Sequence, residues 1–97
     1  MPYEIDFVES AKRQLDALTI PERTGVVGGI EEQLSHEPSV KTRNRKELRP
    51  NAVAPWELRI GNMRVFYDIV EPDRVTILAI GRKEGNKLYI EGKEIQL

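Results

Sequence analysis

One stretch in the second half of the chain constrains the fold more than any other part. Apolar residues recur at every second position through 56–60 and again through 63–69, with Gly61-Asn62 between the two runs. Such alternation on both sides of a two-residue turn predicts a β-hairpin. A second turn at 71–74 leads into the almost wholly apolar run 75–80, which predicts a strand buried on both faces. Together these segments predict an antiparallel three-stranded meander.

The first third of the chain predicts one strand followed by two helices. Apolar residues alternate with acidic ones through 3–7, as in a half-buried strand. From 10 to 18 apolar residues recur at helical spacing, with polar residues such as Gln14 between them. Pro21 suits the first turn of a second helix, which Pro38 stops, and we expect the two helices to pack as a hairpin. The expected fold class is α+β, in which the meander forms one small twisted sheet with the N-terminal strand.

A glycine-rich run, Gly25-Val26-Val27-Gly28-Gly29, lies inside the expected second helix. Each interior glycine costs a helix about 1 kcal/mol relative to alanine. Two explanations stay open: the two helices approach each other closely at these glycines, or the helix begins after them. No strand precedes the run and no Lys-Ser/Thr follows it, so helix packing is favoured over a phosphate-binding loop.

Length and composition limit the class of protein. A chain of 97 residues has room for one core, so we expect a single domain spanning 1–97. The absence of cysteine and the single His36 argue against disulfides and a typical zinc site, and no cofactor is expected. No apolar run approaches the roughly 20 residues of a membrane span, and MPYEIDF lacks the features of a signal peptide. The expected location is the cytoplasm, with no membrane partner.

Charge is distributed unevenly along the chain. Residues 1–37 hold eight acids and three bases, whereas residues 38–97 hold eight acids and twelve bases. Five of those bases and only one acid fall between Lys41 and Arg49, in a proline-bounded segment, 38–55, that reads as a linker. The second part of the chain is therefore the candidate for binding an anion.

The order of these elements resembles the RelE/ParE superfamily, the toxins of bacterial type II toxin–antitoxin systems, over essentially the whole chain. The most specific stretch is 56–69, which contains Arg64-Val65-Phe66-Tyr67, followed by the corner Gly81-Arg82-Lys83 and then Tyr89. The resemblance implies the RelE-like fold, which is related to that of microbial ribonucleases.

The resemblance also implies a toxin, but it leaves the target open. Members similar to RelE cut messenger RNA in the ribosomal A site without a metal, through attack of the ribose 2′-OH on the adjacent phosphate. Members similar to ParE inhibit DNA gyrase, and both kinds are silenced by a cognate antitoxin protein. The favoured expectation is a ribosome-dependent mRNA interferase, an endoribonuclease whose partners are the antitoxin, the ribosome and mRNA. The alternatives are a gyrase inhibitor, or a catalytically weakened member that acts mainly as an antitoxin partner and co-repressor.

The resemblance assigns catalytic roles to three residues. Arg64 and Lys83 would stabilise the charge that builds up on the reacting phosphate. Tyr89 aligns with a tyrosine that acts as the general base in RelE. A phenol has a pKa near 10, so Tyr89 would need nearby cations to favour its ionised form.

Further basic residues are expected to hold the RNA or its phosphates: Arg59, Arg82, Lys46, Arg45 and Lys87. Glu57 departs from the pattern, because it shares a strand face with Arg59 where strongly active members carry a second cation. An acid at that place would either act as an unconventional base or repel RNA. Repulsion, or a salt bridge with Arg59 or Arg64, is the favoured interpretation.

Overall fold

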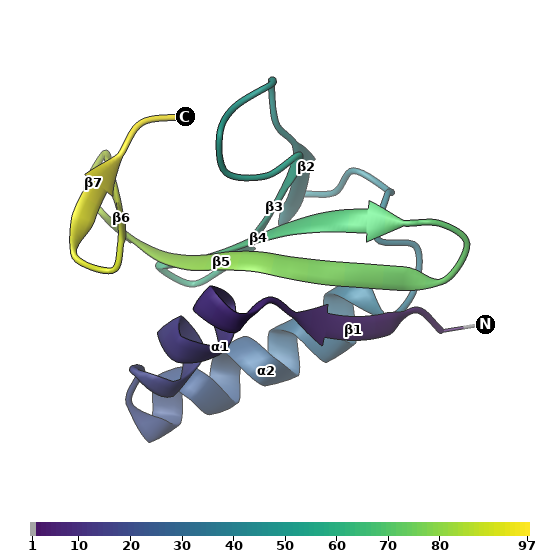
Figure 1. The fold of residues 1–97 in the computed structure, drawn as a ribbon, viewed down its shortest axis with the longest axis horizontal. Coiled ribbons are helices and arrows are strands. Elements are labelled where there is room, and N and C mark those ends of the chain that lie inside the picture. Colours follow the sequence, from purple (N-terminus) through teal and green to yellow (C-terminus); the bar gives the residue numbers. More distant parts are fainter. Residues whose placement is uncertain (1) are drawn as a thin grey trace.

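A seven-stranded sheet with two helices along it makes up residues 2–97, the part of the chain that the computed structural model describes (Figure 1). Both helices lie on the same side of the sheet, beside β1. No helix in the described residues is both long and apolar enough to cross a membrane. The elements are β1 (Glu4–Phe7), α1 (Glu9–Asp16), α2 (Ile20–Leu34), β2 (Arg45–Glu47), β3 (Trp56–Ile60), β4 (Met63–Val70), β5 (Arg74–Glu84), β6 (Lys87–Ile90) and β7 (Lys93–Ile95).

The predicted α+β class is confirmed, and β5 is the central strand. It pairs antiparallel with β4 along one edge, while the other edge holds β1, in parallel, and then β6. The strand order β2-β3-β4-β5-β6-β7 contains the expected meander and extends it at both ends. One extension comes from the segment expected to be a linker, which supplies β2. The other comes from residues 87–95, which form the β6–β7 hairpin.

A β-bulge divides β5 into two halves. Phe66 of β4 is paired with Ala79, but its neighbour Tyr67 is paired with Ile77, so Leu78 has no partner on β4. An extra residue on one strand reverses the alternation of side chains beyond it. Ile77 and Ile80 therefore both contact the helix-side core, although three positions separate them.

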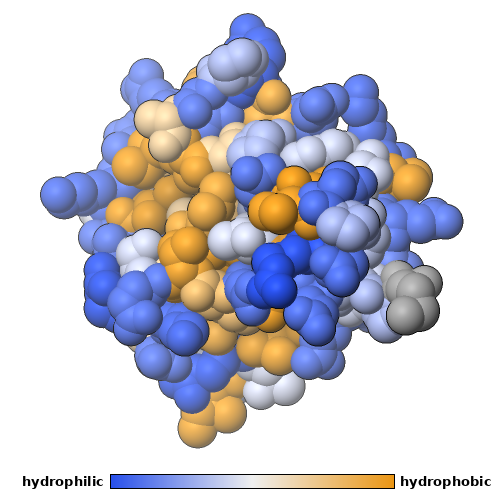
Figure 2. Space-filling model, turned by 45° about the vertical axis from the view of Figure 1, so that its right-hand side comes forward, coloured by the Kyte–Doolittle hydropathy of each residue, from blue (hydrophilic) through white to orange (hydrophobic). Residues whose placement is uncertain are grey.

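Each face of the sheet carries its own hydrophobic cluster. The larger cluster lies between the sheet and the helices and includes Val26, Ile30, Leu58 and Tyr67. A smaller cluster on the other face is centred on Phe66 and packs under the β6–β7 hairpin and the loop before β3. Figure 2 shows that hydrophobic residues also reach the surface, in a band left of centre with hydrophilic residues around it.

Helix α2 begins before its glycine run. Thr19 caps the helix in a capping box, in which the Glu22 N–H donates to Thr19 Oγ1 and the Thr19 N–H donates to a Glu22 carboxylate oxygen. Gly29 lies against the sheet, because an added Cβ would come within 2.5 Å of Ile60 Cδ1. The close approach is thus between helix and sheet, and the expectation of a close helix–helix approach at these glycines is wrong.

The helix hairpin is closed by a side chain from α2. The guanidinium of Arg23 donates to the backbone carbonyls of Leu15, Asp16 and Leu18, at distances of 3.4, 2.9 and 3.4 Å. The carbonyls of Leu15 and Asp16 stand at the C-terminal end of α1, where intrahelical donors are missing, and that of Leu18 lies in the turn before α2. Arg23 therefore ties the end of one helix to the start of the next.

Gln14 is buried, although the sequence places it among the polar positions of its helix. Only 9% of the residue is exposed, and its side-chain oxygen accepts a 2.8 Å hydrogen bond from the Ile80 N–H. On this edge of β5, pairing with β1 ends at Ile77 and pairing with β6 starts at Arg82. Gln14 thus accepts the hydrogen bond of the Ile80 N–H, which lies in the stretch of β5 that neither β1 nor β6 pairs with.

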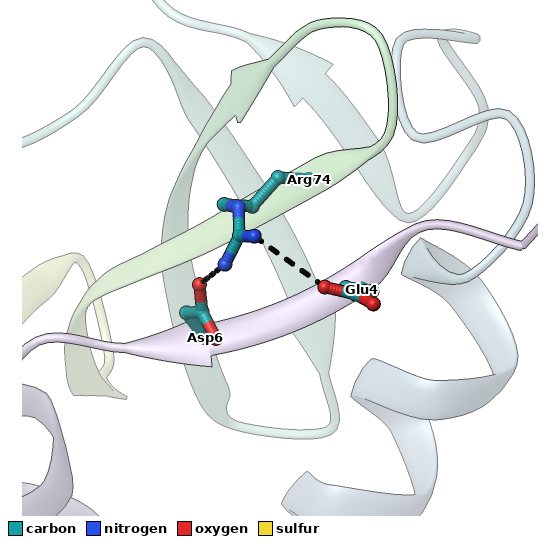
Figure 3. Close-up of polar contacts among 3 residues, drawn as sticks. All are labelled: Glu4, Asp6 and Arg74. Atoms are coloured by element: carbon teal, nitrogen blue, oxygen red, sulfur yellow. Dashed lines mark hydrogen bonds and ion pairs between the residues drawn. The ribbon is translucent and has the colours of Figure 1, made fainter.

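Strand β1 is also joined to β5 by charge. Figure 3 shows Arg74, the first residue of β5, reaching across to the carboxylates of Glu4 and Asp6. The three side chains are between 44% and 71% exposed, so the pairs contribute little to stability individually. They help to fix the parallel register in which Glu4 stands opposite Arg74.

Replacing Gln14 should destabilise the fold. In Gln14→Leu the Ile80 N–H would remain buried without an acceptor, which costs about 1–3 kcal/mol. Lys12→Leu on the exposed face of α1 is the matched control and should change stability by less than about 0.5 kcal/mol. The free energy of unfolding in urea, followed by circular dichroism, measures both, and equal stabilities would contradict the role of Gln14.

Candidate functional site

A groove of about 500 Å³ lies on the face of the sheet that the helices leave open. We call it the cationic groove, because six basic and three acidic residues line it. Three other grooves on residues 2–97, beside α1, along α2 and at the β2–β3 loop, gather two bases, one base and none. The bases are Lys46, Arg49, Arg59, Arg64, Lys83 and Lys87, and the acids are Glu47, Glu57 and Glu94.

Strand register explains why these residues meet. Arg59 of β3 stands directly opposite Arg64 of β4, and Lys46 of β2 stands opposite Glu57. Side chains on directly opposed residues lie on the same face of a sheet. Lys83 joins them because the bulge in β5 turns residues 81 and 83 towards this face.

Arg64 is the best-held cation of the groove. Only 7% of it is exposed, and its Nη1 donates to the carbonyls of Gly61 and Met63 at 2.8 and 2.9 Å. Its Nε and Nη2 donate to no acceptor within residues 2–97. Burial, and then the nearby Arg59, lower the pKa of Arg64 from its ordinary value, but an arginine stays protonated. A fixed guanidinium thus has donors left for an anion.

Glu57 lies among the cations of the groove and is 9% exposed. The favoured interpretation of this residue included a salt bridge with Arg59 or Arg64. The salt bridge is wrong: the four ion pairs within residues 2–97 are Lys41–Glu47, Arg74–Glu4, Arg74–Asp6 and Arg82–Glu22. Repulsion of RNA by Glu57, the other part of that interpretation, stays a prediction.

The loop between β2 and β3 forms one wall of the groove, and Asn51 shapes it. Its side-chain nitrogen donates to the carbonyls of Arg49 and Ala54, and its side-chain oxygen accepts from the N–H groups of Val53 and Ala54. Arg49 and Asn51 both line the groove. Reasoning from the sequence missed this role of Asn51, although Pro50-Asn51 is a typical turn signal.

The β6–β7 hairpin forms the opposite wall, and Gly81 allows it to pack there. A Cβ at Gly81 would lie 2.9 Å from the carbonyl oxygen of Tyr89 and 3.0 Å from side-chain atoms of Leu88 and Ile90. Any larger residue would push β6 away from the sheet. The glycine of the Gly81-Arg82-Lys83 corner is therefore needed for this close approach.

Tyr89 and Arg82 lie outside the cationic groove. They stand opposite each other on β6 and β5, and both line a second groove beside α1, together with Gln14 and Leu18. Arg82 Nη1 donates to a carboxylate oxygen of Glu22 at 2.8 Å. The structure therefore does not bring Tyr89 together with Arg64 and Lys83.

Arg45 is also directed away from the groove. Its Nη1 donates to the carbonyl of Gln33 and, at 3.4 Å, to that of His36, both at the C-terminal end of α2. A cation is favourable where a helix leaves its last carbonyls without donors. The expected RNA-binding residues that do line the groove are Lys46, Arg59 and Lys87.

Comparison with solved structures gives an informative match. A scan against protein-family models found no match, and a search of the curated proteins found no significant one. Among solved structures, the chain is similar to a chain of the toxin–antitoxin complex RelBE2 from Mycobacterium tuberculosis. The two are 30% identical, with a TM-score of 0.73 over 86% of this chain and 93% of the other.

The Arg82–Glu22 pair should make stability depend on pH. The hydrogen bond from Arg82, together with the Thr19 N-cap, lowers the pKa of Glu22 from 4.5 to about 2. Since folding favours the ionised carboxylate, this stabilisation is complete above about pH 4.5 and is lost as the pH falls towards 2.

In Glu22→Gln, which retains an oxygen for the capping box, the free energy of unfolding should fall less steeply than in the native chain over that pH range. Urea unfolding at a series of pH values measures the slope. Glu31→Gln, at an exposed position of α2, is the control and should retain the native slope. The same slope in the native chain and in Glu22→Gln would show that the pair does not titrate in this way.

Proposed function

Because this chain belongs to the RelE/ParE superfamily of toxins, we propose that it is a ribosome-dependent mRNA interferase that cleaves through 2′-OH attack without a metal. One observation carries the proposal: Arg64 and Lys83, which come from different strands, line the same groove with Lys46, Arg59 and Lys87. A concentration of cations on one face suits a polyanion. Lys83 is half-buried and Arg64 is buried, and such a pair suits the binding of one phosphate group of that polyanion.

The proposed chemistry uses the two cations differently. Arg64 is fixed by the β3–β4 turn and has Nε and Nη2 free to hold two phosphate oxygens. It would stabilise the charge that develops on the phosphorane as the 2′-oxygen attacks. Lys83 has no side-chain partner within residues 2–97, so its ammonium is free to donate a proton to the departing 5′-oxygen.

The remaining bases would hold the RNA on both sides of the reacting phosphate. Lys46, Arg59 and Lys87 are exposed and come from β2, β3 and β6. Their spread across the sheet matches a strand of RNA better than an isolated phosphate. Exposed lysines and arginines hold the phosphate backbone of the RNA without reading its base sequence. Codon preference would therefore come from the ribosome or from other contacts.

A cognate antitoxin is the proposed protein partner. The similar RelBE2 structure is a toxin–antitoxin complex. A partner segment that covers the cationic groove needs acidic side chains, because bases outnumber acids six to three there. The hydrophobic band of Figure 2 offers a surface for the apolar side of an amphipathic segment.

Inhibition of DNA gyrase is the second candidate. The position of Tyr89 outside the cationic groove favours it, because a toxin that only binds gyrase needs no general base. Purified chain added in excess to a gyrase supercoiling assay would then stop supercoiling. Undiminished supercoiling, together with cleavage of A-site codons, would exclude this candidate.

Arg64→Ala should abolish most of the cleavage of mRNA on programmed ribosomes. Loss of one fixed donor to the transition state costs about 10²–10³-fold in rate. Lys12→Ala removes a charge from the exposed face of α1, outside the groove, and should cleave at the native rate. Single-turnover cleavage, with thermal melting to check the fold, measures both variants.

Native rates in a folded Arg64→Ala would remove Arg64 from the reaction. An absence of cleavage by the native chain, freed of antitoxin, would refute the interferase proposal itself.

A further inference from the structure

A buried carboxylate among cations is unusual enough to need an explanation. Glu57 is 9% exposed and lines the cationic groove between Lys46, its partner on β2, and Arg59, two residues along β3. An acid in such a place is commonly held by an ion pair. Glu57 belongs to none of the four ion pairs within residues 2–97. Its carboxylate is available to a ligand in the groove.

The surrounding charges come from every strand of the groove. The bases that line it with Glu57 are Lys46 of β2, Arg59 of β3, Arg64 of β4, Lys83 of β5 and Lys87 of β6, with Arg49 from the loop, and the other acids are Glu47 and Glu94. Glu57 is near enough to Arg64 for its carboxylate to offset part of the lowering of the arginine's pKa that burial and Arg59 cause. The carboxylate therefore stands close to the residue proposed to hold the reacting phosphate.

Cleavage through the 2′-OH needs a proton acceptor beside that phosphate. Tyr89 lines the groove beside α1, and the sheet separates that groove from Arg64. Lysine and arginine are protonated near neutral pH and accept no proton. Among the side chains that line the cationic groove, only the three carboxylates can serve, and Glu57 is the buried one.

We propose that Glu57 is the general base of the cleavage reaction, an assignment that rests on the proposed interferase function. Its carboxylate takes the proton of the ribose 2′-OH as the 2′-oxygen forms a bond to the adjacent phosphorus. The bond from phosphorus to the 5′-oxygen breaks, and that oxygen leaves with the electron pair and takes a proton from Lys83. The products are a 2′,3′-cyclic phosphate and a free 5′-OH, after which Glu57 gives its proton to water and Lys83 takes a proton from water.

Two roles have been considered for Glu57, repulsion of RNA and general base, and they predict opposite changes in the cleavage rate of Glu57→Gln. If Glu57 only repelled the RNA backbone, Glu57→Gln would bind RNA more tightly and cleave at least as fast. If Glu57 is the base, the same variant binds at least as tightly but loses about 10²–10⁴-fold in cleavage rate. The sign of the change in rate thus decides between the two roles.

The experiment measures single-turnover cleavage of A-site mRNA on programmed ribosomes by the native chain, Glu57→Gln and Tyr89→Phe. Binding is measured in parallel with mRNA that carries a 2′-deoxyribose at the cleavage site. Glu31→Gln removes the same charge from the exposed face of α2 and should cleave at the native rate. Thermal melting checks that each variant is folded.

A slow Glu57→Gln with retained binding is the expected result. A native rate in Glu57→Gln, or a loss confined to Tyr89→Phe, would overturn the assignment while leaving the interferase function intact. If the native chain itself cleaves nothing, the interferase function fails and the assignment falls with it.

Discussion

The register between β4 and β5 is the constraint on which the groove depends. With the bulge at Leu78, β5 can keep both Ile77 and Ile80 in the core beneath the helices and still present Lys83 on the opposite face. Without the extra residue, strict alternation would place Lys83 on the helix side and Arg82 beside Arg64. One unpaired residue in the middle of the longest strand therefore decides which of two adjacent cations enters the groove.

The parts of the fold that could be predicted from the sequence are those fixed by local pattern. The hairpin around Gly61-Asn62 and the helix with Pro21 in its first turn depend on neighbouring residues alone, and both are present. The burial of Gln14 depends on a gap in pairing 66 positions away, which no local pattern encodes. The β6–β7 hairpin likewise depends on close packing over Gly81.

The same distinction applies to the site. Arg59 and Arg64 could be placed together from the sequence, because a two-residue turn sets them directly opposite each other. Tyr89 and Arg45 could not be placed, because which way they face depends on the bulge and on the path of the segment after α2. Glu57 was recognised as a departure from the family pattern, but its lack of an ion-pair partner is a three-dimensional fact. Glu57 weakens the match to the family pattern, and it is also the residue that we propose as the proton acceptor.

The side chain of Gln14 has a consequence for how the chain meets other copies of itself. Strand β5 is covered by β4 along one edge, and by β1, Gln14 and β6 in succession along the other. Its backbone thus presents no stretch within residues 2–97 to which a foreign strand could add, and intermolecular sheet formation is left to the outer edges of β1, β2 and β7. Those three strands are only three or four residues long, and each carries charged residues. The longest strand, which contains the apolar run 75–80, is therefore the one best protected from aggregation, and a single amide side chain completes that protection.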